Sequence, residues 1–389
     1  MWWPTYAPPF RESFARDSMG GEMKPSQPLS VCSGPRSPRS PRQRPSRGLA
    51  RPDVGLSLFR CGLRLWIFGG ILCGCAPRLS PEMVELARDA GAQVECAPLQ
   101  ERIISIVDAM ASEPEDGAVS MEWGIPHRRL ASKQAILEAL SALGVEHRVV
   151  SMPDRHVPVE NIVVELPGTG AGPGGAPASE VLQLTAHFDV WYTAADDNTS
   201  GVVSALEAIA ILRNLELSRS IQVLFYDMEE TGIDGSLAWW DRYGNNQVHA
   251  VLNLDAIAYA SDKPGSQAAP PGFRLPSKGN FILGLGNGAA RHHLRWMAEL
   301  SAEIPDSAAF LAVYGPADNE HPATNDFHRS DHSPAWSRGL PGIFMTDTAN
   351  LRNPHYHQPT DLPDTLDPAF HCGVTRLVVG SMAAYAEAP

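Results

Sequence analysis

The sequence predicts a single α/β domain built around a mainly parallel β-sheet. From residue 181 onward, short and nearly continuous apolar runs alternate with helical or loop segments, which is typical of strands buried on both faces. The chain has 389 residues, of which 43% are hydrophobic and 19% charged, so it can bury a large core. It contains no internal repeat and no apolar stretch of about 20 residues. A repeat protein and a polytopic membrane protein are therefore excluded.

The N-terminal part differs from the rest in composition. Residues 1–58 form a basic tail rich in Pro, Arg and Ser, which cannot bury enough apolar surface to fold and is expected to be disordered. Residues 59–80 combine a positive flank, a short apolar core and small residues, the pattern of an export signal. Cys75 stands where a bacterial lipoprotein carries its lipid, although a short buried strand or helix is an alternative interpretation. We expect an extracytoplasmic protein (periplasmic, lipid-anchored or secreted) whose folded domain spans residues 81–389.

The charge is unevenly distributed along the chain. The formal net charge of −13 divides into +8 over residues 1–80 (12 Lys and Arg against 4 Asp and Glu) and −21 over residues 81–389 (19 against 40). A domain with this excess of acidic residues repels the phosphate backbone of nucleic acids, so nucleic-acid binding is excluded as the function. Such a domain suits cationic ligands, among them divalent metals and protonated amines.

The elements of the domain follow from periodicity. Apolar residues at helical spacing predict three helices, and Gly144 follows the second where a helix C-cap belongs. These helices are expected at 99–111, 132–143 and 201–217. Short apolar runs predict strands at 147–152, 161–166, 181–185, 221–226, 251–257, 281–285 and 342–346. In a sheet of this kind the functional residues are expected at the carboxyl ends of the strands.

Polar residues follow the buried run at 181–185. His187 and Asp189 are two residues apart, so in extended chain Asp189 can reach the ring nitrogen of His187 that a metal leaves free. Alone, this pair is more commonly a hydrogen-bonded structural histidine. Asp196 and Asp197 precede the third helix, where acids can cap the helix, but a carboxylate held there can also bridge two cations.

Paired acids follow the run at 221–226. Glu229 and Glu230 at the end of a buried strand are costly unless a metal or a proton neutralises one of them. Neighbouring side chains diverge, so one Glu can bind a metal while the other faces its water. Asp255 lies inside the apolar run at 251–257, where a solvated face is not expected.

Histidines appear again near the C-terminus, in Asp331-His332 and in His355-Tyr356-His357. Imidazole and carboxylate without cysteine suit Zn, Mn or Co at an open, catalytic site. Two such ions that share a carboxylate and a water are a recurring arrangement for hydrolysis. The six cysteines show neither zinc-finger spacing nor a dense disulfide framework, and whether Cys96 and Cys372 pair is left open.

The ordered set of motifs resembles the M28 family of di-zinc peptidases, whose best-known members are secreted bacterial aminopeptidases. The likeness covers about residues 95–385. It rests on His187-x-Asp189, Asp197-Asn-x-Ser-Gly201, Glu229-Glu230-x-Gly-Ile-x-Gly-Ser236, Asn253-Leu-Asp255 and Tyr356-His357. The resemblance implies a single three-layer domain with a mixed, mainly parallel central sheet flanked by helices.

The resemblance also implies a ligand set. His187 and Asp255 would hold one zinc ion, Glu230 and His357 the other, and Asp197 would bridge the two. His355 and His332 compete for the place of His357, which matches the motif best.

Further roles follow from the same likeness. Glu229 would be the general base, which takes a proton from the attacking water and gives it to the leaving amine. Asp189 would support His187, and Asp331 with His332 would lie behind the ligands or contact substrate. Tyr356 would stabilise the oxyanion, unless it is simply a packed aromatic residue. A cis peptide after Asp197 is implied as well.

The expected activity is that of an aminopeptidase with two Zn²⁺ per chain (Mn or Co as alternatives) acting on peptides with a free N-terminus. A glutaminyl cyclase-like transferase, a metal-dependent carboxypeptidase or amidohydrolase, and a non-catalytic binding domain are the competing functions. The compact segment after Glu230 favours a peptidase over the cyclase, and the complete ligand set argues against a non-catalytic domain. The sequence fixes neither the side-chain preference nor the oligomeric state. Loops such as 305–330 are expected to build the specificity pocket, and Trp239, Trp240 and Trp336 are expected in the core.

Overall fold

The computed structural model describes residues 78–111, 126–152, 158–171, 176–244, 247–270, 273–315 and 327–388. The tail expected at 1–58, nearly all of the export segment at 59–80 and Cys75 lie outside the described residues. Among the described helices, none is both long enough and apolar enough to cross a membrane.

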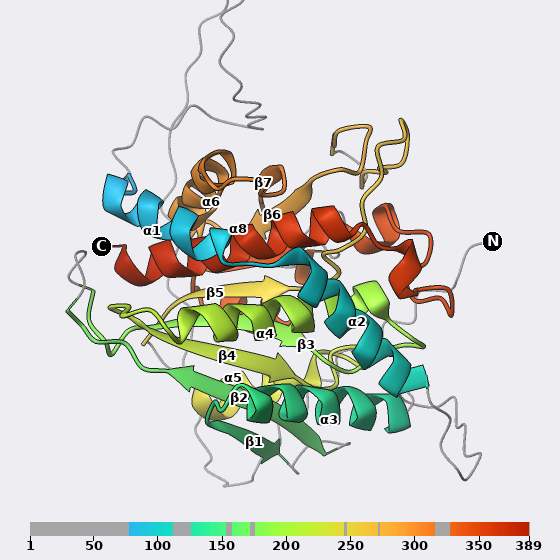
Figure 1. The fold of residues 1–389 in the computed structure, drawn as a ribbon, viewed down its shortest axis with the longest axis horizontal. Coiled ribbons are helices and arrows are strands. Elements are labelled where there is room, and N and C mark those ends of the chain that lie inside the picture. Colours follow the sequence, from blue (N-terminus) through green and yellow to red (C-terminus); the bar gives the residue numbers. More distant parts are fainter. Residues whose placement is uncertain are drawn as a thin grey trace, which may run out of the picture. The chain divides into compact units, whose positions relative to one another are not determined.

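The described strands form one eight-stranded sheet in the order β1-β2-β4-β3-β5-β8-β6-β7 (Figure 1). Their bounds are β1 His147–Met152, β2 Val159–Leu166, β3 Val181–His187, β4 Ser220–Tyr226, β5 Val248–Leu254, β6 Ile282–Gly286, β7 Phe310–Tyr314 and β8 Gly342–Thr346. The central strands β4, β3, β5 and β8 are parallel to one another, whereas β1, β2 and β6 introduce antiparallel pairs. The mixed, mainly parallel sheet is thus confirmed.

One strand runs against the expectation of parallel pairing. β6, expected at 281–285, is antiparallel to β8. The segment between β5 and β6 contains no helix among its described residues, so the chain re-enters the sheet from the edge where β5 ended. An antiparallel return needs no crossover helix, which explains the reversal. β7, which the periodicity did not predict, then pairs in parallel with β6 through the crossover helix α6.

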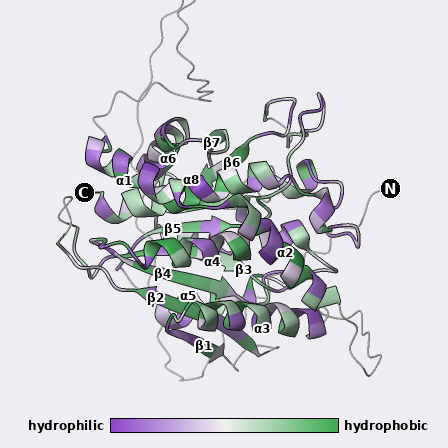
Figure 2. Ribbon diagram, in the orientation of Figure 1, coloured by the Kyte–Doolittle hydropathy of each residue, from purple (hydrophilic) through white to green (hydrophobic). Residues whose placement is uncertain are grey.

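Helices cover both faces of the sheet. Their bounds are α1 Pro81–Ala92, α2 Cys96–Ala111, α3 Pro126–Ala142, α4 Gly201–Leu212, α5 Asp234–Tyr243, α6 Arg291–Glu303, α7 Ser333–Ser337 and α8 Pro368–Glu387. α4 and α8 pack on β3, and α1, α2, α3 and α6 belong to the same large core cluster. α5 and α7 form the core on the opposite face. The three-layer architecture is therefore confirmed, and hydrophobic residues dominate α4 and β4 in Figure 2.

The helix boundaries have local causes. Gly144 follows α3 with φ +63°, as expected for a C-cap glycine. α4 ends at Leu212, earlier than expected, because the chain turns there to reach β4. α8 begins where the Asp367 side chain accepts a hydrogen bond from the Phe370 N–H at 3.0 Å.

Cys372 on α8 forms a disulfide with Cys96 of α2, which answers the question that the sequence left open.

This topology gathers strand ends at one edge. β3, β4, β5 and β8 end at His187, Tyr226, Leu254 and Thr346, so the residues that follow them emerge together. β4 and β5 lie on opposite sides of β3, and at such a switch point the connections diverge and leave a crevice.

Candidate metal centre

Two groups of ligand-type side chains occupy the crevice. The ligand atoms of His187, Glu229 and Asp255 all lie within 4.8 Å of one another, and so do those of a second group. The second group consists of Asp197, Glu230 and His357. All six residues were predicted as site residues from the sequence.

Asp197 stands between the two groups. Its Oδ1 lies 3.2 Å from His187 Nε2, and its Oδ2 lies 3.1 Å from His357 Nε2. His187 Nε2 is 3.8 Å from Asp255 Oδ1, and His357 Nε2 is 3.0 Å from Glu230 Oε2. Each oxygen of one carboxylate thus faces a different histidine, which is the geometry required of a bridging ligand.

The donor atoms fit metal ions better than they fit one another. His187 Nε2, His357 Nε2, Asp197 Oδ1 and Glu230 Oε1 are buried and make no hydrogen bond of good geometry among the described residues. Buried polar atoms without partners are rare in native proteins, since each costs free energy. Divalent cations would satisfy all of these atoms, and the imidazole and carboxylate set suits zinc.

The pKa values of these carboxylates and histidines are shifted because the groups lie close together in a buried space. Burial raises the pKa of Glu229 well above its usual range and that of Glu230 to about 7. For His357, burial opposes protonation, but close contacts with the carboxylates of Asp197 and Glu230 outweigh it and raise the pKa to about 10. Although burial acts in the opposite direction, contacts with His187 and His357 hold the pKa of Asp197 well below its usual range.

The local backbone directs these side chains. Met228, Ala256 and His357 have φ values of +58°, +52° and +55°, in the left-handed region that non-glycine residues adopt mainly under constraint. The Asp197–Asn198 peptide bond is cis, as the resemblance implied. The Asn198 side chain donates to the carbonyl of Leu254 at 2.9 Å and accepts from the N–H of Ala256 at 3.2 Å, so it ties this segment to the end of β5.

Asp189 supports the site in more ways than its spacing suggested. His187 Nδ1 lies 3.0 Å from the backbone carbonyl of Asp189 and 3.7 Å from its carboxylate. The two carboxylate oxygens instead accept hydrogen bonds from the N–H groups of Glu229 at 2.9 Å and Glu230 at 3.0 Å. Asp189 therefore orients the histidine with its main chain and the paired acids with its side chain.

The remaining predicted residues lie at different depths. Tyr356 lines the pocket and stacks on His357, with ring centroids 3.9 Å apart. Asp331 is fully buried, and burial raises its pKa to about 7. His332 is buried behind the pocket wall, where it stacks on Phe344, so it does not contact substrate as one prediction allowed. His355 lies outside both groups, with Nδ1 3.0 Å from Thr360 Oγ1.

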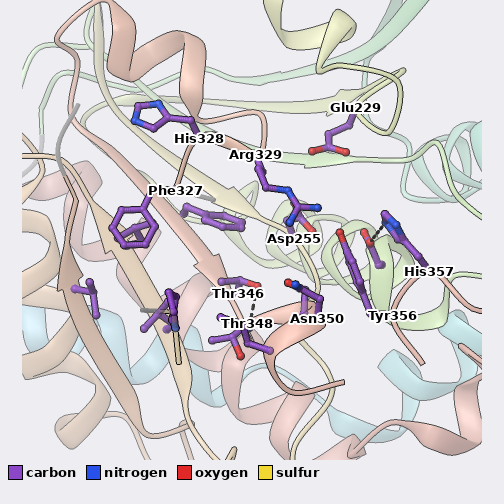
Figure 3. Close-up of a pocket in the computed structure, with 18 of the residues that line it drawn as sticks. Glu229, Asp255, Phe327, His328, Arg329, Thr346, Thr348, Asn350, Tyr356 and His357 are labelled. Atoms are coloured by element: carbon purple, nitrogen blue, oxygen red, sulfur yellow. Dashed lines mark hydrogen bonds and ion pairs between the residues drawn. The ribbon is translucent and has the colours of Figure 1, made fainter. Parts of the chain in front are cut away.

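A cavity of about 420 Å³ opens from the two groups. In Figure 3, Glu229, Asp255, Tyr356 and His357 gather at one end of this pocket and Phe327 at the other. The far wall is apolar and comes from several separate segments. Its residues are Phe273, Leu275, Leu283, Leu285, Val313, Phe327 and Phe344.

Most of this wall escaped the sequence analysis. Val313 and Phe327 fall in the range 305–330 that was expected to contribute, but the other segments gave no signal beyond ordinary strand and loop patterns. Arg329 also lines the pocket and was not singled out. Trp239, Trp240 and Trp336 are buried in the core, as predicted.

Sequence comparisons identify relatives of this chain. The Escherichia coli K12 protein YfbL is 29% identical over 258 residues, which cover 61% of this chain and 74% of YfbL. The probable aminopeptidase YDR415C of Saccharomyces cerevisiae is 26% identical over 196 residues, which cover 48% of this chain and 46% of the yeast protein. The match to YDR415C therefore spans less than half of that relative.

Structural comparisons identify the fold. The LapA aminopeptidase of Legionella pneumophila superposes with a TM-score of 0.54 at 17% identity, over 80% of this chain and 76% of LapA. The glutaminyl cyclase of Porphyromonas gingivalis gives 0.51 at 15% identity, over 74% of this chain and 98% of the cyclase. At these identities the likeness shows the fold alone, which peptidases and cyclases share.

The family itself is decided by sequence. The family model described as Peptidase family M28 matches residues 161–381, more than half of the chain and nearly all of the segment that carries the two ligand groups. The chain belongs to peptidase family M28, and it is a peptidase.

Proposed function

We propose that this peptidase is an aminopeptidase with a two-cation centre that releases N-terminal residues with apolar side chains. The observation that carries the proposal is the position of Asp197. One of its oxygens lies 3.2 Å from His187 Nε2 and the other 3.1 Å from His357 Nε2. A carboxylate that faces two histidines in this way is suited to hold two ions side by side.

Zinc is the proposed metal, with manganese and cobalt as alternatives, because the ligands are imidazole and carboxylate. His187 and Asp255 would hold one ion, Glu230 and His357 the other, and Asp197 both. Cations bound here would supply Lewis acidity, which polarises the scissile carbonyl and lowers the pKa of water.

Glu229 is proposed as the general base. Its carboxylate lies within 4.8 Å of the ligand atoms of His187 and Asp255, so it can accept a proton from a water that attacks at this position. Burial raises its pKa, which makes it a better proton acceptor than a solvated carboxylate. The same group then delivers the proton to the departing amine. Tyr356, which lines the pocket beside His357, is placed to donate its hydroxyl proton to the developing oxyanion.

The pocket supports the substrate class. Its volume of about 420 Å³ lies toward the lower end of the range for small-ligand sites, ~300–1,000 Å³. An apolar side chain can fill the wall that includes Phe327 and Phe344, while a protonated α-amine is attracted to the acidic end with Glu229 and Asp255. A free N-terminal residue with an apolar side chain satisfies both ends.

Arg329 supports a second candidate, a carboxypeptidase. It is the one arginine among the described residues of the pocket, and Figure 3 shows its side chain extending toward Asp255. A guanidinium beside the scissile bond is suited to bind a C-terminal carboxylate.

The test compares substrates that differ only at their ends. The purified full chain is assayed with leucine 4-nitroanilide, its N-acetylated form, and an N-acylated dipeptide that ends in leucine. We expect cleavage of the first alone, its loss on chelation, and recovery with zinc or cobalt. Glycine and glutamate anilides serve as controls for the apolar pocket. Cleavage of the N-acylated dipeptide but not the anilide would favour the carboxypeptidase, and a fully active metal-free protein would refute both.

We also propose that the protein works outside the cytoplasm and that a lipid on Cys75 anchors it. The Cys96–Cys372 disulfide supports this location, because such bonds form and persist in oxidising compartments. Cell fractionation, with the mass of the mature N-terminus, tests the location and the anchor separately. A full-length, reduced protein in the cytoplasmic fraction would contradict both.

A further inference from the structure

His357 is held less directly than its counterpart His187. The His187 ring is almost fully buried and has its second nitrogen 3.0 Å from the carbonyl of Asp189. The His357 side chain is 31% exposed. Its ring is stacked on Tyr356. The position of His357 therefore depends on the backbone that carries it.

That backbone is anchored four residues before His357 by a buried amide. Asn353 donates from Nδ2 to Asp196 Oδ2 at 2.7 Å, and its Oδ1 accepts from the N–H of His355 at 2.8 Å. Asn353 is only 4% exposed, so water does not substitute for these bonds. One side chain thus links the segment that carries Asp197 to the loop that carries His357.

A second anchor lies four residues after His357. The Asp361 carboxylate accepts from the N–H of Asp196 at 3.0 and 3.1 Å and from the N–H of Asp197 at 3.2 Å. The backbone carbonyl of Asp361 also accepts from the N–H of Ala195 at 3.2 Å. The loop from 353 to 361 is therefore fastened at both ends to the segment that precedes α4.

We propose that Asn353 is a positioning residue: through Asp196 it sets the separation of Asp197 and His357, and so the cation affinity of that half of the centre. This inference rests on the proposed two-cation centre. It concerns mainly the site that His357 completes, because Asn353 bonds Asp196 and the main chain of His355, whereas Asp197, as the proposed bridging ligand, also serves the other site.

An amide is the only common side chain that satisfies both sides of this link. It donates toward the Asp196 carboxylate and accepts from the main chain of His355. Aspartate at 353 would place one carboxylate oxygen against another at about the 2.7 Å that now separates donor and acceptor. Exchanging the two residues, with Asp196→Asn and Asn353→Asp together, restores a donor facing an acceptor. Asn at 196 can still accept from the N–H of Ala258, a bond of 2.9 Å in this structure.

The experiment measures the two cation sites separately in the full-length protein. Chelator competition with Zn²⁺ gives two dissociation constants, cobalt absorption reports the ligand geometry, and urea unfolding gives stability. The variants are Asn353→Ala, Asn353→Asp and the exchange of Asp196 and Asn353. Asn287→Ala is the matched control, because Asn287 is an equally buried amide that bonds Leu340 and Ala290 on strand-end turns away from the ligands.

We expect Asn353→Ala to weaken the site that includes His357 by about 10- to 100-fold, the usual effect of losing a partner that orients a metal ligand, and to weaken the other site less. Asn353→Asp should weaken it at least as much, and the exchange variant should recover most of the loss. Asn287→Ala should change stability only. If the alanine variant does not fold, the exchange variant decides.

Three results would overturn the inference. They are wild-type affinity at both sites in folded Asn353→Ala, an equal loss at both sites, and a folded exchange variant that remains as weak as Asn353→Asp. Failure of the proposed function looks different, because the wild-type protein itself would then bind fewer than two ions.

Discussion

Replacing Glu229 by glutamine separates the proposed base from the ligands. The substitution keeps shape and removes the proton acceptor. The backbone of Glu229 is held by its N–H, which donates to Asp189 at 2.9 Å, and this bond is independent of the side chain that changes. The segment between Asp227 and Gly235, which carries Glu229, is also packed closely on itself. A Cβ added to Gly235 would stand only 2.1 Å from the carbonyl oxygen of Asp227. The variant should therefore fold and bind metal as the wild type does.

The size of the effect follows from the role. A positioned general base contributes about 100- to 10,000-fold to a rate, which corresponds to about 3–5 kcal/mol in the barrier. We expect the loss for Glu229→Gln to fall within this range. The loss should appear in kcat, with zinc content and unfolding midpoint unchanged.

Glu230→Gln is the informative comparison. Glu230 Oε2 lies 3.0 Å from His357 Nε2 within the second ligand group, so its amide should bind metal more weakly and lose activity through lost metal. Excess zinc should rescue Glu230→Gln and leave Glu229→Gln inactive. Glu303→Gln, at a surface ion pair with Arg88, controls for the loss of one acidic group. If zinc rescued Glu229→Gln and not Glu230→Gln, the two roles would have to be exchanged.

Three further predictions concern the ligand, the disulfide and acid stability. His357→Ala should lose one zinc ion per chain while His355→Ala keeps both, because only His357 lies with Asp197 and Glu230; metal content of each variant decides. Replacing both half-cystines by serine should lower the free energy of unfolding by about 3–5 kcal/mol in urea titrations, since the bond closes a loop across a sequence separation of 276; an unchanged midpoint would show that the bond contributes nothing. Burial lowers the pKa of His371 to about 4 and that of His293 to about 3, so both stay neutral in the folded state while the unfolded chain takes up protons below pH ~6.5. Stability should therefore fall on acidification from pH 6.5, by about 2 kcal/mol per histidine at pH 5, and His371→Gln should flatten the slope of unfolding free energy against pH; an identical slope would refute the assignment.

His187, Glu229 and Asp255 were predictable because each lies at or just after a strand end, whereas Asp197 and His357 lie in the segments before α4 and after residue 353. A buried parallel strand is a short apolar run, and an acid or histidine directly after it has few explanations other than a site. Once β3, β4 and β5 lie side by side, His187, Glu229 and Asp255 must meet. No long-range geometry had to be known beyond the order of the strands.

The spacing argument for Asp189 was only partly sufficient. Residues two apart share a face in extended chain, but β3 ends at His187, so the alternation stops before Asp189 is reached. The carboxylate is consequently free to accept from the N–H groups of Glu229 and Glu230, and the main-chain carbonyl contacts the His187 ring instead. A periodicity argument extends only as far as the strand that supports it.

The apolar wall depended on packing that no single segment records. Phe273, Leu283, Val313 and Phe344 come from a loop and three strands, and they meet because β6 returns antiparallel to β8. The parallel arrangement expected for β6 would have reversed that strand with respect to β8 and would have given a different wall. Side-chain preference therefore depends on the direction of one strand, whereas the positions of His187, Glu229 and Asp255 depend only on the parallel core. For this reason the chemistry of the centre is readable in the sequence and the choice of substrate is not.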